Sequence, residues 1–250
     1  MTNLSGKKVV VVAGSRGIGA ASVEALAAAG AEVLFTYLTS QQPAEELAAR
    51  VAKAGGKAAC MKLDATDEAQ SRAFAGQVKE RLGRVDVLFN NAGDMVARKP
   101  LPEVDAAYVR QVFDLNVLST IIVTKDLLPL IPAGGVILNM TSAAARNGGG
   151  LGSGIYAASK GAILTLTRGW ATELAPRGIR VLAVAPGVID TDFHKRHSKP
   201  ELLATVTKTV PAGKYGTPED VARAVVYLAG EGGGFMTGVT IDINGGVYMA

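Results

Sequence analysis

The stretch Val9-Val10-Val11-Val12-Ala13-Gly14-Ser15-Arg16-Gly17-Ile18-Gly19 decides the fold of this chain of 250 residues. Its apolar, β-branched first half is typical of a strand that is buried on both faces of a sheet. Its second half is rich in glycine, and the alanine-rich segment 20–29 behind it predicts a helix that ends at Gly30. Backbone amides at the start of such a helix stabilise a pyrophosphate, so this order of elements predicts a nucleotide site. An ordinary glycine-rich turn is the alternative interpretation.

Six further apolar runs follow the first, and helical segments separate them. This alternation predicts an α/β fold, a doubly wound parallel sheet of about seven strands in a single domain, with helices on both faces. A hydrophobic content of 48% suits a sheet that is covered on both faces. The runs that we expect to be strands are residues 9–13, 33–37, 58–63, 85–90, 136–140, 179–185 and 239–243.

The second expected strand ends at Thr36 and Tyr37, where no acidic side chain stands. An Asp or Glu at this position would accept hydrogen bonds from a ribose 2′-hydroxyl. Arg16 in the glycine loop instead offers a cation that could pair with a 2′-phosphate. We therefore expect a preference for NADP(H), with NAD(H) as the second option. The alternative is that Arg16 points into solvent.

Tyr156 and Lys160 stand four residues apart, and Ser142 follows the apolar run 136–140. Residues i and i+4 share a face of a helix, so we expect the Lys160 ammonium beside the Tyr156 phenol. A fixed cation favours the phenolate, which predicts a pKa for Tyr156 below its usual value of about 10. Ser142 is expected at the carboxyl edge of the sheet, where it could hold a substrate oxygen while Tyr156 transfers a proton. A solvated tyrosine beside a solvated lysine is the alternative.

The order of these features resembles the classical short-chain dehydrogenase/reductase family over nearly the whole chain. Further motifs that carry the resemblance are Asp64, Asn90-Asn91-Ala92-Gly93, Asn116, and Pro186-Gly187 with Thr191. The resemblance implies a Rossmann-like fold and an oxidoreductase that interconverts a carbonyl and a secondary alcohol by hydride transfer. It also implies a homotetramer, with residues 1–93 as mainly the dinucleotide-binding half.

The same resemblance implies a catalytic set made of Ser142, Tyr156, Lys160 and Asn116, in which Asn116 binds a water that links the lysine to bulk solvent. It implies that Asp64 contacts the adenine and that Thr191 borders the nicotinamide. The residues expected to bind the cofactor are Gly14, Ser15, Arg16, Gly17, Ile18, Gly19, Thr36, Tyr37, Asp64, Ala65, Asn91, Ala92, Gly93, Tyr156, Lys160, Pro186, Gly187, Val188, Ile189 and Thr191.

The glycine loop departs from the family pattern at its start. The loop of the family usually begins with Thr-Gly, whereas Val12 and Ala13 stand at those positions. We expect Gly14 to supply the missing backbone freedom one residue later, and the hydrogen bond of the threonine hydroxyl to be lost or replaced.

Residues 190–216 are expected to form a lid over the substrate, and they contain both histidines of the chain, His194 and His197. Two histidines three residues apart are a weak metal signal without further ligands, so we expect no metal site. Cations of the lid could attract an acidic substrate. The alternative is a solvated basic loop. The cations in question are Lys195, Arg196, Lys199 and Lys208, together with the two histidines.

The substrate is expected to be a small polar ketone, keto-acid or sugar-type carbonyl, because the glycine-rich segment 147–154 resembles family members that act on such compounds. A 3-oxoacyl-[acyl-carrier-protein] reductase is the alternative, since residues 244–249 resemble the end of those enzymes. However, residues 130–135 lack the basic stretch that usually helps dock the acidic carrier protein. A non-catalytic nucleotide-binding regulator would be a different class of protein, and it would predict damage to the catalytic set.

The remaining composition suggests a cytoplasmic protein. The single cysteine, Cys60, excludes an internal disulfide, and its place in an expected strand predicts a buried core residue. The first residues lack the charged and apolar pattern of a signal peptide. No apolar stretch is expected to span a bilayer. A net charge of +4 could indicate nucleic acid as a partner, but the basic residues are scattered along the chain, so we expect none.

Overall fold

Seven parallel strands form one sheet in the part of the chain that the computed structural model describes, residues 2–197 and 210–249. The strand order is β3-β2-β1-β4-β5-β6-β7. The fold class predicted from the sequence is confirmed, and every apolar run coincides with a strand to within two residues. The strands are β1 (Lys8–Val12), β2 (Glu32–Tyr37), β3 (Lys57–Lys62), β4 (Val87–Asn90), β5 (Val136–Met140), β6 (Arg180–Pro186) and β7 (Thr240–Ile243).

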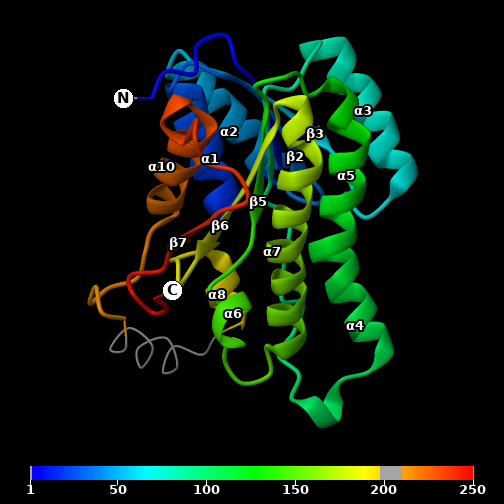
Figure 1. The fold of residues 1–250 in the computed structure, drawn as a ribbon, viewed down its shortest axis with the longest axis vertical. Coiled ribbons are helices and arrows are strands. Elements are labelled where there is room, and N and C mark those ends of the chain that lie inside the picture. Colours follow the sequence, from blue (N-terminus) through cyan, green and yellow to red (C-terminus); the bar gives the residue numbers. More distant parts are fainter. Residues whose placement is uncertain (1, 198–209, 250) are drawn as a thin grey trace.

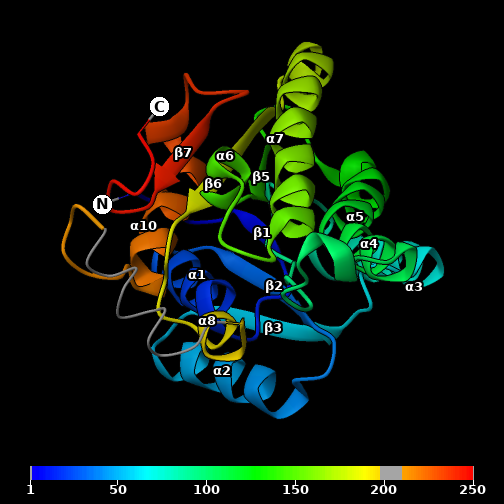
Figure 2. The same cartoon turned by 90° about the horizontal axis from the view of Figure 1, so that it is seen from below.

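Helices cover both faces of this sheet (Figures 1 and 2). One face packs against α1 (Gly17–Ala28), α2 (Gln41–Lys53) and α10 (Pro218–Ala229). The other packs against α3 (Glu68–Leu82), α5 (Ser119–Leu127) and α7 (Gly154–Leu174). The helix α4 (Ala106–Phe113) continues into α5, while the short helices α6 (Ala144–Asn147) and α8 (Asp192–His197) lie near the carboxyl ends of the strands.

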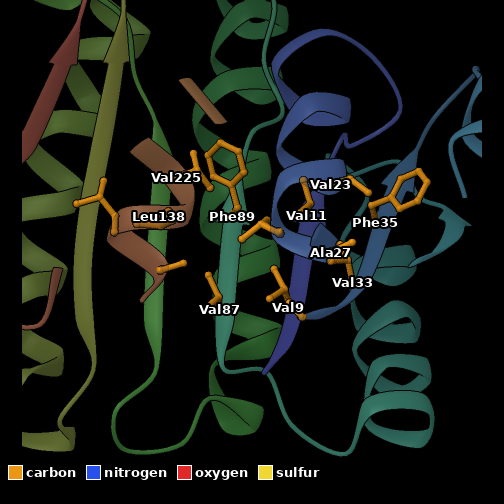
Figure 3. Packing of buried hydrophobic residues seen from close by; sticks show 14 of the residues in the cluster. Val9, Val11, Val23, Ala27, Val33, Phe35, Val87, Phe89, Leu138 and Val225 are labelled. Atoms are coloured by element: carbon orange, nitrogen blue, oxygen red, sulfur yellow. The ribbon is translucent and has the colours of Figure 1, made fainter. Parts of the chain in front are cut away.

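The central strand β1 divides the core into two layers because successive side chains of a strand point to opposite faces. Val9 and Val11 pack with residues of α1 and α10, as Figure 3 shows. Val10 and Val12 pack on the other face, with residues of α3 and α5. All four valines are almost fully buried. The unbroken valine run therefore serves two cores at once, which an alternating pattern could not do.

The strand order reverses direction at β1, which pairs with β2 on one side and with β4 on the other. The connections that follow β1 and β4 therefore run to opposite faces of the sheet, where α1 and α5 pack, and a crevice lies between them. In open α/β sheets, ligands bind at this crevice, outside the carboxyl ends of the strands. The glycine loop after β1 lies there.

The glycine loop differs from the expectation in two ways. The helix α1 begins at Gly17 and not at residue 20, so the last glycines of the loop form its first turn. Ala13, and not Gly14, takes the left-handed conformation, with a φ of 57°. Gly14 is needed for a different reason, because a Cβ there would lie only 2.6 Å from Phe35 Cβ on β2. The expectation that Gly14 replaces the missing glycine is therefore wrong.

The expectation for Cys60 is also corrected. Cys60 is half-buried and not fully buried, because β3 is the last strand at one edge of the sheet in the described part of the chain. The continuous helix over Ala106–Leu130 is long and apolar enough to cross a membrane by length and composition alone. Only 39% of its most apolar window is buried. Part of its surface packs against the sheet, with Ile122 and Val123 in the core.

Replacing Ala13 with glycine should raise the stability of the protein. A left-handed conformation costs a residue with a Cβ about 1–2 kcal/mol, and glycine removes this cost while adding about 0.5–1 kcal/mol of unfolded-state entropy. We expect the free energy of unfolding to rise by up to about 1 kcal/mol, measured by urea denaturation. The control is Ala25→Gly inside α1, which should lower it by about 1 kcal/mol. A loss of stability in both variants would contradict the strain at Ala13.

Candidate active site

The side chains of Tyr156 and Lys160 lie together near the start of α7, as the spacing predicted. The Lys160 ammonium lies 5.9 Å from the centre of the Tyr156 ring. Only 8% of Tyr156 and 2% of Lys160 is exposed. The segment before α7 bends through Gly148, Gly149 and Gly152, each of which has a positive φ. The glycine-rich segment thus delivers the first turn of α7 to the carboxyl edge of the sheet.

Ser142 follows β5 and forms a side-chain hydrogen bond with Tyr156. Its Oγ also accepts a hydrogen bond of 3.1 Å from the Ala144 amide, which fixes the side chain. Burial raises the pKa of Tyr156 to about 12, although the bond to Ser142 lowers it, and the negative charge of Asp94 raises it further. The expected lowering is therefore wrong for this structure, because the cost of burying a phenolate is the largest effect. At neutral pH the phenol carries its proton.

Lys160 donates a hydrogen bond of 3.1 Å to the Met140 carbonyl at the end of β5. Burial lowers the pKa of the lysine to about 8, although the charge of Asp94 acts in the opposite direction. The ammonium is thus mostly charged at pH 7 and loses its proton about one pH unit higher. The bond to Met140 aligns Lys160 with the same strand end that carries Ser142.

Asn116 lies in a π-helical turn, Asp114–Leu118, between α4 and α5. Its Nδ2 donates to the carbonyls of Asp94, at 2.7 Å, and Val112, at 2.8 Å. Its Oδ1 is buried and has no partner among the described residues. A Cβ at Gly93 would lie 2.5 Å from this oxygen and 2.6 Å from the Lys160 Nζ, so glycine is required between the two. Nothing in the sequence indicated the π-helical turn that carries Asn116.

Hydrogen bonds with residues of β2 and of the segment after β4 hold the glycine loop in place. Asn91 Nδ2 donates a hydrogen bond of 2.8 Å to the Ala13 carbonyl, and the Ala13 amide donates one of 2.9 Å to Thr36 Oγ1. A Cβ at Gly19 would lie 2.4 Å from the Ala13 oxygen, so the loop and the helix approach too closely for any side chain. Ser15, Ile18 and Tyr37 are half-buried around this loop.

The start of α1 is suited to an anion. Within the described chain, no acidic residue stands in its first turn and no side chain caps it. Arg16 occupies the N-cap position and is exposed. Free amides and a positive helix end therefore face the crevice, as a pyrophosphate requires. Together with the unpartnered Asn116 oxygen near Lys160, these features fit a dinucleotide that extends along the carboxyl edge of the sheet.

The other residues expected at the cofactor lie along the same edge. Asp64 follows β3, and its Oδ1 accepts hydrogen bonds from the amide and hydroxyl of Thr66. Thr191 lies opposite the glycine loop, since a Cβ at Gly17 would be 3.4 Å from its Cγ2. The remaining residues of this set lie at or just after the ends of β3, β4 and β6; they are Ala65, Ala92, Pro186, Gly187, Val188 and Ile189.

The expected lid is described only in part. Residues 198–209, with Lys199 and Lys208, lie outside the described residues, as do the side chains of His194 and Lys195. Arg196 and His197 both contact the carboxylate of Asp94, so neither side chain is free to attract an acidic substrate. Asp94 was missed at the sequence level, although it directly follows the Asn-Asn-Ala-Gly segment. In the described part of the chain, no group of three or more His, Cys, Asp or Glu residues could hold a metal ion.

Comparison with known proteins agrees with this geometry. A family model described as enoyl-(acyl carrier protein) reductase matches residues 12–248. The chain is 34% identical to galactitol 2-dehydrogenase of Agrobacterium fabrum, over 99% of both proteins. It is 33% identical to 3-oxoacyl-[acyl-carrier-protein] reductase of Synechocystis, over the full length of both.

Two solved structures have nearly the same fold. A short-chain dehydrogenase/reductase from Serratia marcescens is 36% identical over 98% of each chain, with a TM-score of 0.92. A blue fluorescent protein from a metagenomic library, solved in complex with NADPH, is 38% identical over 99% of this chain and 100% of that one, also with a TM-score of 0.92. Because likeness of this degree extends over whole chains, this protein belongs to the short-chain dehydrogenase/reductase family of oxidoreductases.

Proposed function

We propose that this protein is an NADP(H)-dependent oxidoreductase that interconverts a small polar carbonyl compound and its secondary alcohol. The observation that carries the proposal is the buried contact of Tyr156 with both Ser142 and Lys160 at the carboxyl edge of the sheet. A non-catalytic regulator would have no need for a buried lysine, whose desolvation is costly.

In the reductive direction, Ser142 and Tyr156 donate hydrogen bonds to the carbonyl oxygen and polarise it. The bound nicotinamide supplies the hydride. Tyr156 then gives its proton to the developing alkoxide, which suits a phenol that is protonated at neutral pH. Lys160 stabilises the resulting phenolate and donates to the nicotinamide ribose. Asn116 holds, through its unpartnered oxygen, the water that returns the proton.

The cofactor preference is proposed from the second strand and the glycine loop. Thr36 is occupied by its bond to Ala13, and the exposed guanidinium of Arg16 lies at the start of α1. A 2′-phosphate would find a cation there and no carboxylate. The relative solved with NADPH supports this preference.

The substrate class is proposed from the relatives. The galactitol dehydrogenase supports a polyol or sugar-type substrate. The carrier-protein reductase among the relatives supports a 3-oxoacyl thioester as the second candidate.

We further propose a cytoplasmic homotetramer in which residues 1–93 form mainly the cofactor half and residues 190–216 cover the substrate. A spectrophotometric screen of keto-sugars, keto-acids and 3-oxoacyl thioesters with NADPH separates the two substrate classes, since activity confined to thioesters would exclude the first.

Replacing Tyr156 with phenylalanine should lower kcat by at least about 100-fold, the usual contribution of a positioned acid. Binding of NADPH, followed by nicotinamide fluorescence, should remain because the phenyl ring keeps its packing. The matched control is Tyr108→Phe, which removes a hydroxyl that donates to the Ala97 carbonyl at 2.7 Å in the same apolar cluster. Comparable activity losses in the two variants would count against Tyr156 as the acid.

Replacing Arg16 with alanine should reduce the preference for NADPH over NADH by roughly 10- to 100-fold, because a charge-assisted bond contributes about 1.5–3 kcal/mol. The preference is measured as the ratio of the two dissociation constants. Arg110→Ala on α4 removes another exposed guanidinium and serves as the control. An unchanged ratio in Arg16→Ala would remove this residue from the cofactor site.

The affinity for NADPH should fall as the pH rises through about 8, where Lys160 loses its proton. The neutral amine can no longer make a charge-assisted bond to the ribose, and we expect a weakening of about tenfold between pH 7 and pH 9.5. In Lys160→Arg the guanidinium keeps its charge, so the affinity should be flat over this range. A fall of equal size in both proteins would assign the titration to another group.

A further inference from the structure

The helix α8 lies directly over the catalytic tyrosine. The ring of Phe193 is 5.7 Å from the ring of Tyr156, centre to centre, and tilted by 42°. The His197 ring in turn packs edge-on against Phe193 at 5.0 Å. Phe193 also packs on the small apolar cluster that contains Met95, Tyr108 and Tyr156. One face of α8 therefore packs through Phe193 against the ring of Tyr156.

One carboxylate holds this helix in place. Asp94 Oδ2 accepts a hydrogen bond of 2.7 Å from Arg196 Nη1, and Asp94 Oδ1 lies 2.6 Å from His197 Nε2. Arg98 adds a bond of 2.6 Å from its Nε to the His197 carbonyl. These contacts join segments about one hundred residues apart in the chain. We call the group of Asp94, Arg196 and His197 the clamp.

The clamp is not an ordinary surface ion pair. The His197 side chain is 8% exposed and that of Asp94 is 19% exposed, so water screens their contact poorly. Arg196 is 59% exposed and contributes less. Removing the charge of Asp94 by an Asp-to-Asn change leaves one acceptor oxygen where the carboxylate offers two to Arg196 and His197. One of these partners then loses its acceptor and the other keeps a weaker, neutral hydrogen bond, which costs more than losing a solvated pair.

Asp94 also contacts the proposed catalytic residues. Its backbone carbonyl accepts the bond from Asn116, and its own carboxylate is oriented by the Met95 amide at 2.8 Å. The charge of Asp94 acts on both Tyr156 and Lys160. A single residue thus contacts the proposed proton relay through its backbone and α8 through its side chain.

From this geometry we infer that Asp94 is a positioning residue that determines substrate size: through the clamp, it holds Phe193 against Tyr156 and restricts the site to compact carbonyl compounds. The predicted effect on substrate size rests on the proposed function, whereas the contacts of the clamp do not depend on it. An isosteric Asp94→Asn removes the charge and keeps the shape. It should loosen α8, so that a bulky group beside the carbonyl can displace Phe193.

The first test measures the clamp without catalysis. Hydrogen exchange of the full-length protein is followed by mass spectrometry in peptides that cover Asp192–His197. In Asp94→Asn, exchange there should be about tenfold faster, as expected when a bond to a charged group of about 1.4 kcal/mol or more is lost. The matched control is Glu24→Gln, which breaks the exposed pair of Glu24 with Arg50 on α1 and α2. Equal exchange in α8 for the two variants would overturn the clamp.

The second test measures selectivity with NADPH and two ketones that differ only beside the carbonyl, ethyl acetoacetate and ethyl benzoylacetate. In Asp94→Asn the ratio of kcat/KM for the bulky over the compact ester should rise about tenfold, and Phe193→Ala should give a similar rise. If hydrogen exchange in α8 is faster in Asp94→Asn but its ratio of kcat/KM values equals that of Glu24→Gln, the size restriction is refuted. If the unmodified protein reduces no carbonyl compound at all, the proposed function fails, and the exchange result alone still decides the clamp.

Discussion

The structure depends on the burial of its central strands on both faces. A parallel strand with helices on both faces has no side that is open to water, so β1 carries four valines in a row that serve two cores. Since all seven strands run in one direction, their carboxyl ends lie along one edge, and the strand order reverses at β1. The glycine loop, Ser142 and the start of α7 meet at this edge for that reason alone. The site follows from the packing constraint and not from any one motif.

Burial of Tyr156 and Lys160 also determines their protonation states. A phenol and an ammonium packed in an apolar cluster both move toward their neutral forms, which raises the pKa of Tyr156 to about 12 and lowers that of Lys160 to about 8. The site therefore holds a protonated phenol beside a lysine that is still charged at neutral pH. This arrangement suits donation of a proton to a developing alkoxide. Asp94 adds a negative charge near both groups and ties them to α8.

Strained backbone conformations occur at the same edge of the sheet. Ala13 and Val96 have positive φ values although neither is glycine, and each stands beside a segment that forms the site. The Ala97 amide bonds back to the Met95 carbonyl around Val96, which is a strained three-residue turn. Such conformations persist where surrounding contacts determine them, and here the bonds to Asn91 and Thr36 hold the loop at Ala13.

The sequence alone determined the sheet and most of the site, because valine runs, glycine loops and the Tyr156–Lys160 spacing act through local geometry and burial. It also placed Ser142 and many of the residues that we expect to bind the cofactor after the ends of strands, where a parallel sheet brings them together. Only the tertiary structure decided the pKa of Tyr156, which depends on how deeply its neighbours bury it. The same holds for the left-handed Ala13 and the contacts of Asp94 with Arg196 and His197. Those features join residues that are distant in the chain, and no local sequence pattern predicts which distant residue will contact a given side chain.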